Sequence, residues 1–167
     1  DLNITYLNKS RNVQAVRHAN FTIDKGDSLG LVGESGSGKS TMAMGMLRIL
    51  PQDSIQMTGS ALFMGKDLVT ISDEEMNKLR WKEIAVVFQK AMNSLSPVHR
   101  IGMQIEDIYH VHEPKATKKE IHDRTMELLK LVNMPERVYK LYPHEMSGGM
   151  LQRVAIVISL LHRPKLL

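Results

Sequence analysis

The chain has 167 residues, of which 43% are hydrophobic and 24% charged, the composition of an ordinary globular domain with its own core. Its formal net charge of +4 is compatible with a polyanionic ligand or an acidic membrane surface but is too small to indicate nucleic acid binding. The lack of cysteine excludes disulfides and thiolate metal sites, and no apolar run approaches the ~20 residues of a membrane-spanning helix.

The first part of the chain is expected to form strands. Residues 2–7 and 19–23 alternate roughly between apolar and polar side chains, as strands do. Residues 24–27 have the composition of a turn. Residues 28–32 are mostly apolar, which predicts a short strand running into the loop of glycine and serine that follows.

A helix and a further strand are expected after this loop. Residues 40–50 are predicted to be helical until Pro51 stops the helix, and residues 57–64 have the pattern of a strand.

The middle of the chain combines a helix start with an apolar strand. Ser72 and Glu75 have the spacing of a capping box, which predicts a helix to about Arg80. Residues 84–88 are apolar throughout, as expected of a strand that is buried on both faces, and this strand ends at Gln89.

Residues 90–145 are expected to form short helices separated by prolines. One helix begins near Thr117, and a further apolar helix follows residues 146–150 and continues to about His162. This order of elements predicts an α/β core that carries a helical subdomain. The residues expected on the apolar face of the first of these helices are Ile121, Thr125, Leu128, Leu129 and Val132.

Residues 33–40 match the pattern G-x-x-x-x-G-K-[ST] at every fixed position. Glycines let the backbone curl so that N–H groups face phosphate oxygens, and the next helix directs its positive N-terminus at the same anion. Lys39 would reach the β- and γ-phosphates of ATP, and the Ser40 hydroxyl would bind Mg²⁺. A flexible turn is the alternative, which the flanking strand and helix disfavour. The predicted ATP-binding residues of this loop are Gly33, Glu34, Ser35, Gly36, Ser37, Gly38, Lys39, Ser40 and Thr41.

A second glycine-containing segment, Ser147-Gly148-Gly149, would alone indicate only a serine-capped helix start. It follows the phosphate loop and a helical region, with Gln89 at the end of an apolar strand in between. Together, these features resemble the ATP-binding subunit of ABC transporters over essentially the whole chain.

Several short segments carry the resemblance. Residues 146–150 look like the family signature Leu-Ser-Gly-Gly-Gln, and residues 87–89 look like its Q-loop. Tyr6 stands where the family places an aromatic residue that stacks on adenine, with an ordinary strand tyrosine as the alternative.

The resemblance is narrower for one branch of the family. Residues 88–97, the phosphate loop and Met150 are similar to the importers of oligopeptides, dipeptides and nickel. Leu151 departs from the arginine that is usual in this branch.

The resemblance implies an α/β fold with a P-loop NTPase (RecA-like) core, an N-terminal antiparallel β part and a helical subdomain insert. It implies one nucleotide-binding domain over residues 1–167. Residues 1–89 and 153–167 would form the core, and residues 90–152 would form the helical subdomain with the signature.

The same resemblance implies a mechanism with partners. Two such subunits, identical or paralogous, meet head to tail, and each ATP lies between one phosphate loop and the partner's signature. Gln89 helps to hold Mg²⁺ and the attacking water, so that it acts in catalysis with Lys39. The helical insert docks on integral membrane permease subunits. An extracytoplasmic solute-binding protein delivers the solute to these permease subunits. The ATP-binding subunit is therefore expected on the cytoplasmic face of the membrane. No nucleic acid partner is expected. The signature residues are Ser147, Gly148, Gly149 and Met150.

Residues 163–167 look like the approach to the family's Walker B strand, so the sequence is expected to stop before the Walker B aspartate and the catalytic base. We therefore expect weak or no ATP hydrolysis from this chain alone. The seven histidines are expected to be surface or packing residues rather than metal ligands, because no spaced acid or thiol accompanies them.

Three functions remain open at this point. The first is an ATPase subunit that drives import of oligopeptides, dipeptides or a related small solute such as nickel. The second is a non-transport ABC-type ATPase of DNA repair or translation, which the lack of a long heptad run disfavours. The third is a catalytically incomplete nucleotide-binding module.

Overall fold

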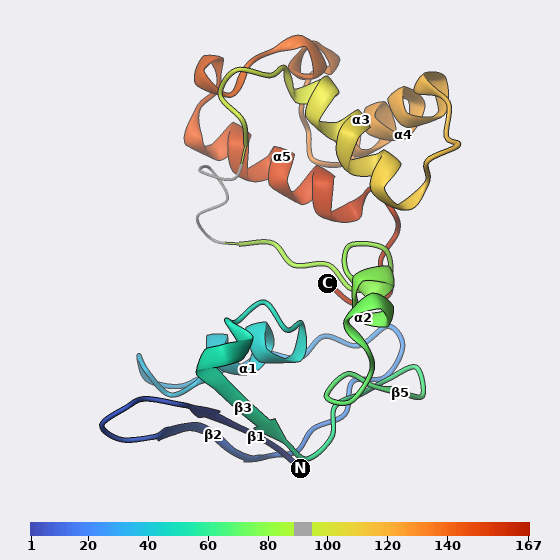
Figure 1. Cartoon of the computed structure of the whole chain (residues 1–167). Helices are drawn as coiled ribbons and strands as arrows, with labels where there is room; N and C mark the ends of the chain where they lie inside the picture. Colours follow the sequence, from blue (N-terminus) through green and yellow to red (C-terminus); the bar gives the residue numbers. More distant parts are fainter. Residues whose placement is uncertain (89–94) are drawn as a thin grey trace. The chain divides into compact units, whose positions relative to one another are not determined.

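The computed structural model describes residues 1–88 and 95–167, which form two compact units, Asp1–Met76 and Asn77–Leu167 (Figure 1). Each unit is described by itself. The predicted Q-loop residue Gln89 lies outside the described residues.

The first unit is built on a three-stranded antiparallel sheet of β1 (Leu2–Tyr6), β2 (Val13–Ala19) and β3 (Ile55–Thr58), in the order β2-β1-β3 (Figure 1). This confirms the predicted N-terminal antiparallel β part. The strand predicted at 19–23 is wrong, because β2 covers Val13–Ala19 and residues 20–23 are exposed coil. Pairing across the hairpin sets this register, since Tyr6 of β1 lies opposite Val13.

Helix α1 (Lys39–Met46) packs on this sheet through Met42, which joins a core of Leu2, Ile4 and Val16. The helix begins where the sequence predicts but ends earlier than residue 50, because Arg48 adopts a left-handed conformation with φ 49°. The predicted strand at 57–64 is likewise divided.

The division falls at Gly59, which has φ 91° and ends β3. A short hairpin of β4 (Leu62–Phe63) and β5 (Lys66–Asp67) follows. The turn before α2 (Asp73–Leu79) contains the predicted capping box: the Glu75 N–H donates to Ser72 Oγ at 3.2 Å, and the Ser72 N–H donates to Glu75 Oε2 at 3.4 Å.

Two predicted apolar strands do not form as expected. Residues 28–32 pair with no strand in the described part of the chain, and Val32 is 97% exposed. In residues 84–88 only Ile84 and Ala85 are buried, and Ile84 makes isolated parallel bridges to Arg80 and Leu166. An apolar run becomes a strand only where neighbouring strands satisfy its backbone, and such neighbours are not supplied by the described residues.

The second unit is helical. It contains α3 (Ile101–His112), α4 (Lys118–Leu131) and α5 (Gly148–Leu160), with short 3-10 turns at Glu136–Lys140 and Pro143–Glu145 (Figure 1). Its core confirms four residues of the predicted apolar face of α4, since Ile121, Thr125, Leu128 and Leu129 are buried. Val132, predicted with them, follows the end of the helix and is half-buried.

The start of α4 also follows the prediction. Thr117 caps α4 through a complete capping box with Glu120. The helix predicted after residues 146–150 is α5, which begins at Gly148 and ends at Leu160, close to the expected end near His162. None of the helices in the two described ranges has the length and apolar character that crossing a bilayer requires.

Candidate phosphate-binding site

The loop of residues 33–38 leads directly into α1, with Gly38 as the residue before the helix. Gly36 and Gly38 have φ values of 82° and 91°, a region that side chains with a Cβ disfavour. Gly38 is also constrained by space, because a Cβ atom there would lie 2.3 Å from the carbonyl oxygen of Ala15 in β2. Backbone conformation therefore favours glycine at both positions, and at Gly38 a side chain would also collide with β2.

The Lys39 side chain closes the loop on itself. Its ammonium donates to the carbonyl oxygens of Gly33 at 2.8 Å and Glu34 at 2.7 Å, and to Ser37 Oγ at 3.1 Å. A lysine ammonium has three N–H donors, so these contacts match its full capacity. The loop thus holds a positive charge at its centre, bound by neutral oxygens that an anion could replace.

The N-terminus of α1 is open to an anion. Gly38 provides no side-chain cap, and no acidic residue lies in the first turn. The first N–H groups of a helix have no partner within the helix, and they carry a partial positive charge. Ser40 is exposed in the first turn, so its hydroxyl is accessible to a ligand. The curled backbone, the ammonium and the open helix end fit a polyphosphate group.

Tyr6 reaches this site from the sheet. Its hydroxyl lies 3.1 Å from Thr41 Oγ1, in the first turn of α1. The sequence pattern suggested Tyr6 as a nucleotide contact but gave no indication of its bond to Thr41, which is 35 residues away. The structure therefore brings Tyr6 together with the predicted residues 33–41.

The second unit contains another exposed helix start. Ser147 caps α5 by accepting a hydrogen bond from the Met150 N–H at 3.3 Å. Gly148 and Gly149 are exposed, and their N–H groups have no hydrogen bond within the described ranges. Met146 and Met150 pack against the helical core on either side. The core therefore holds Ser147 and the two glycine amides at the surface, where they are available to an anion.

The histidines show no arrangement for metal binding. In the part of the chain that the structure describes, no group of three histidine or acidic side chains could hold a metal ion. His112 and His162 instead contact each other edge to face, with ring centroids 5.2 Å apart, and Tyr109 packs on His162. Burial lowers the pKa of both imidazoles, to which the nearby Lys82 cation contributes. Both rings are therefore uncharged packing groups at neutral pH.

One contact of the site region was not anticipated. The Arg48 guanidinium, just beyond the end of α1, bonds to Asp73 and to the Val69 carbonyl. A single arginine after a helix has no spacing that would indicate these partners, so no sequence signal could have identified them.

The loop that leads into α1 has the geometry expected of the P-loop class, and comparison with solved structures agrees with this class. The dimeric ATP-binding cassette MJ0796, bound to ADP and Pi, superposes with a TM-score of 0.80 at 27% identity, covering 98% of this chain and 71% of that chain. The cbiO1 protein of Clostridium perfringens, part of a cbiONQ ABC transporter complex, gives a TM-score of 0.68 at 25% identity, covering 98% of this chain and 62% of that one. These similarities confirm the predicted fold class.

The family model described as ABC transporter matches residues 16–167, so the chain belongs to the ABC transporter family. The oligopeptide transport ATP-binding protein OppD of Bacillus subtilis is 45% identical across the whole chain, which covers 47% of that protein. OppD of Escherichia coli is 41% identical, again across the whole chain and 50% of its own length. The predicted resemblance to the oligopeptide branch is thus confirmed. The chain spans about half the length of these relatives.

Proposed function

We propose that this protein is the ATP-binding and ATP-hydrolysing subunit of an ABC importer for oligopeptides, dipeptides or a related small solute. The observation that carries the proposal is the closed loop of residues 33–38, with the Lys39 ammonium at its centre and the open end of α1 beside it. The names of the OppD relatives, which describe oligopeptide transport, support the choice of cargo class.

ATP binding follows from an exchange of partners at Lys39. Its ammonium now bonds to the uncharged oxygens of Gly33, Glu34 and Ser37. A phosphate oxygen carries a negative charge, so its Coulomb attraction to the ammonium favours replacement of these uncharged partners. The backbone N–H groups of the loop and of the first turn of α1 then surround the remaining phosphate oxygens.

Mg²⁺ would be held by the Ser40 hydroxyl together with phosphate oxygens, with Gln89 as a further ligand. The metal ion would neutralise charge on the β- and γ-phosphates. Tyr6 would present its ring to the adenine while its hydroxyl remains bonded to Thr41. In this arrangement Lys39 and Gln89 are the residues of this chain that we assign to catalysis.

The signature residues would act on a second subunit. Ser147 and the amides of Gly148 and Gly149 form an exposed anion-binding helix start in the helical unit. We propose that they contact the ATP bound by an identical or paralogous partner in a head-to-tail dimer. The dimeric state of the MJ0796 cassette supports this arrangement.

The remaining partners follow from the transporter role. The helical region between residues 90 and 152 would dock on integral membrane permease subunits, and an extracytoplasmic solute-binding protein would deliver the cargo. The subunit would thus act as a peripheral protein at the cytoplasmic face of the membrane, within one nucleotide-binding domain that includes residues 1–167.

Titration with Mg-ATP tests the proposal. The full chain should bind Mg-ATP, and Lys39→Ala should raise the Kd at least about tenfold because the central positive charge is lost. Lys66→Ala is the matched control, since Lys66 lies in the same unit but pairs with Glu75 at 3.7 Å. Lack of binding by the unmodified chain, or equal affinities for all three proteins, would contradict the proposal.

A further inference from the structure

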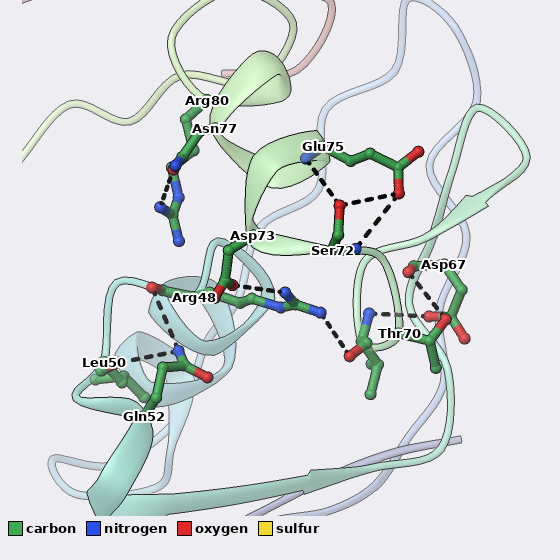
Figure 2. Close-up of polar contacts among 11 residues, drawn as sticks. Arg48, Leu50, Gln52, Asp67, Thr70, Ser72, Asp73, Glu75, Asn77 and Arg80 are labelled. Carbon is green, nitrogen blue, oxygen red and sulfur yellow. Dashed lines mark hydrogen bonds and ion pairs between the residues drawn. The ribbon is translucent and has the colours of Figure 1, made fainter.

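Arg48 has a left-handed backbone conformation, which is unfavourable in free energy for a residue with a side chain. It follows the last turn of α1, and its φ of 49° lies in the left-handed region, which glycine occupies more easily. Its N–H donates to the Gly45 carbonyl at 2.8 Å, and Gln52 Nε2 donates to the carbonyl oxygens of Arg48 and Leu50 (Figure 2). The backbone is thus held in this conformation, and the contacts of the side chain must offset its cost.

The side chain of Arg48 is 11% exposed, and its contacts include a bond to a backbone carbonyl and an ion pair. One terminal nitrogen donates to the Val69 carbonyl at 2.7 Å, and the other donates to Asp73 Oδ1 at 3.1 Å (Figure 2). The partners lie 21 and 25 residues further along the chain. Arg48 therefore ties the end of α1 to the segment of residues 69–73.

That segment is itself fixed, so it serves as an anchor. The Asp67 carboxylate accepts hydrogen bonds from the N–H groups of Ala61 at 3.0 Å and Val69 at 3.1 Å. The capping box of Ser72 and Glu75 orders the next turn (Figure 2). A guanidinium bound to such a segment restrains the helix to which it belongs.

The restraint acts on a short helix whose other end carries the phosphate loop. Helix α1 has 8 residues, and an isolated helix of this length is not stable in water. Its placement depends on tertiary contacts: Tyr6 bonds to Thr41 at the N-terminal end, and Gly45, the second-to-last residue of the helix, packs against Ile4. Arg48 supplies a further contact just beyond the C-terminal end.

We propose that Arg48 is a positioning residue for phosphate binding: by fixing the C-terminal end of α1, it sets the position of the N-terminal turn and the loop of residues 33–38. This inference rests on the proposed ATP-binding function. Arg48 does not touch the nucleotide and acts through the helix.

The test compares Arg48→Met, Arg48→Lys and Asp73→Asn with the unmodified full chain. The matched control is Lys66→Met, which removes a cation beside the same segment without altering a contact of α1. Mg-ATP affinity is measured by titration at a temperature where circular dichroism shows every variant folded, so that Kd refers to folded protein. Backbone amide chemical shifts of Gly36 and Gly38 are recorded without nucleotide as a direct report on loop geometry.

We expect Arg48→Met to raise Kd about tenfold, equivalent to about 1.4 kcal/mol, and to shift both glycine amide signals. Arg48→Lys and Asp73→Asn should give smaller changes, because each preserves part of the network, and Lys66→Met should match the unmodified chain. If Arg48→Met unfolds, the graded effects of the other two variants test the same inference.

Wild-type affinity and unchanged glycine signals in folded Arg48 and Asp73 variants would overturn the inference, even if their melting temperatures fell. Failure of the unmodified chain to bind Mg-ATP would instead refute the proposed function. The amide signals would still report whether Arg48 controls the loop.

Discussion

Replacing Gly38 by alanine should destabilise the first unit by a predictable amount. Its φ of 91° lies in the left-handed half of backbone space, where an L-residue costs about 1–2 kcal/mol. The new Cβ would lie 2.3 Å from the Ala15 carbonyl oxygen, and this neighbour belongs to the backbone of β2. Overpacking of this kind costs about 1–3 kcal/mol, so the total loss should be at least about 2 kcal/mol.

Thermal unfolding of the full chain, followed by circular dichroism, measures this loss. For a protein of this size, about 2 kcal/mol lowers Tm by about 4–8 °C. Gly149→Ala is the matched control, because a Cβ at Gly149 would meet nothing within 4 Å and the residue is helical. That substitution should raise stability by about 0.4–1 kcal/mol. An unchanged or higher Tm for Gly38→Ala would show that the loop does not have the described conformation.

Two further predictions concern hydrogen bonding and pH. Tyr6→Phe removes the bond to Thr41 but keeps the aromatic ring. It should lower the free energy of unfolding in urea by about 0.5–1.5 kcal/mol, while ATP affinity stays within about twofold. A large loss of affinity would show that the hydroxyl, rather than the ring, serves the nucleotide. Burial lowers the pKa of His112 and His162 below the usual 6.5. In this pH range the folded state therefore binds fewer protons than the unfolded state. The free energy of unfolding should fall as the pH drops from about 6.5 through the lowered pKa values. The double variant His112→Gln/His162→Gln should flatten this slope in urea unfolding at a series of pH values, and an unchanged slope would contradict the assignment.

The parts that sequence predicted well depend on residues close together in the chain. The phosphate loop requires glycines, a lysine and a helix start within nine residues, and the Lys39 contacts span no more than six. The apolar face of α4 follows from helical periodicity, and its capping box joins residues only three apart. Such features form from local geometry, so a pattern in the sequence is sufficient to predict them.

The parts that failed depend on partners distant in the chain. Strand β2 has no clear alternation, since Val16 is its only buried residue, and it is a strand because β1 pairs with it. Residues 28–32 have a better apolar pattern, yet among the described residues they find no paired neighbour. The apolar pattern thus predicted a strand at residues 28–32, which remain unpaired in the described part of the chain, and did not predict β2, which pairs with β1.

The same reasoning explains why the local conformation of the loop could be predicted from sequence and the contacts that support the loop could not. Positive charge and glycine backbone are sufficient to identify where phosphate would bind, and both lie in residues 33–41. The position of this loop depends on α1, which is too short to be stable alone and is held by residues of β1 and of the segment that precedes α2. Substitution of Arg48 should therefore affect nucleotide binding although no motif indicates this residue. Substitutions of exposed residues at the same sequence distance from the loop should leave nucleotide binding unchanged.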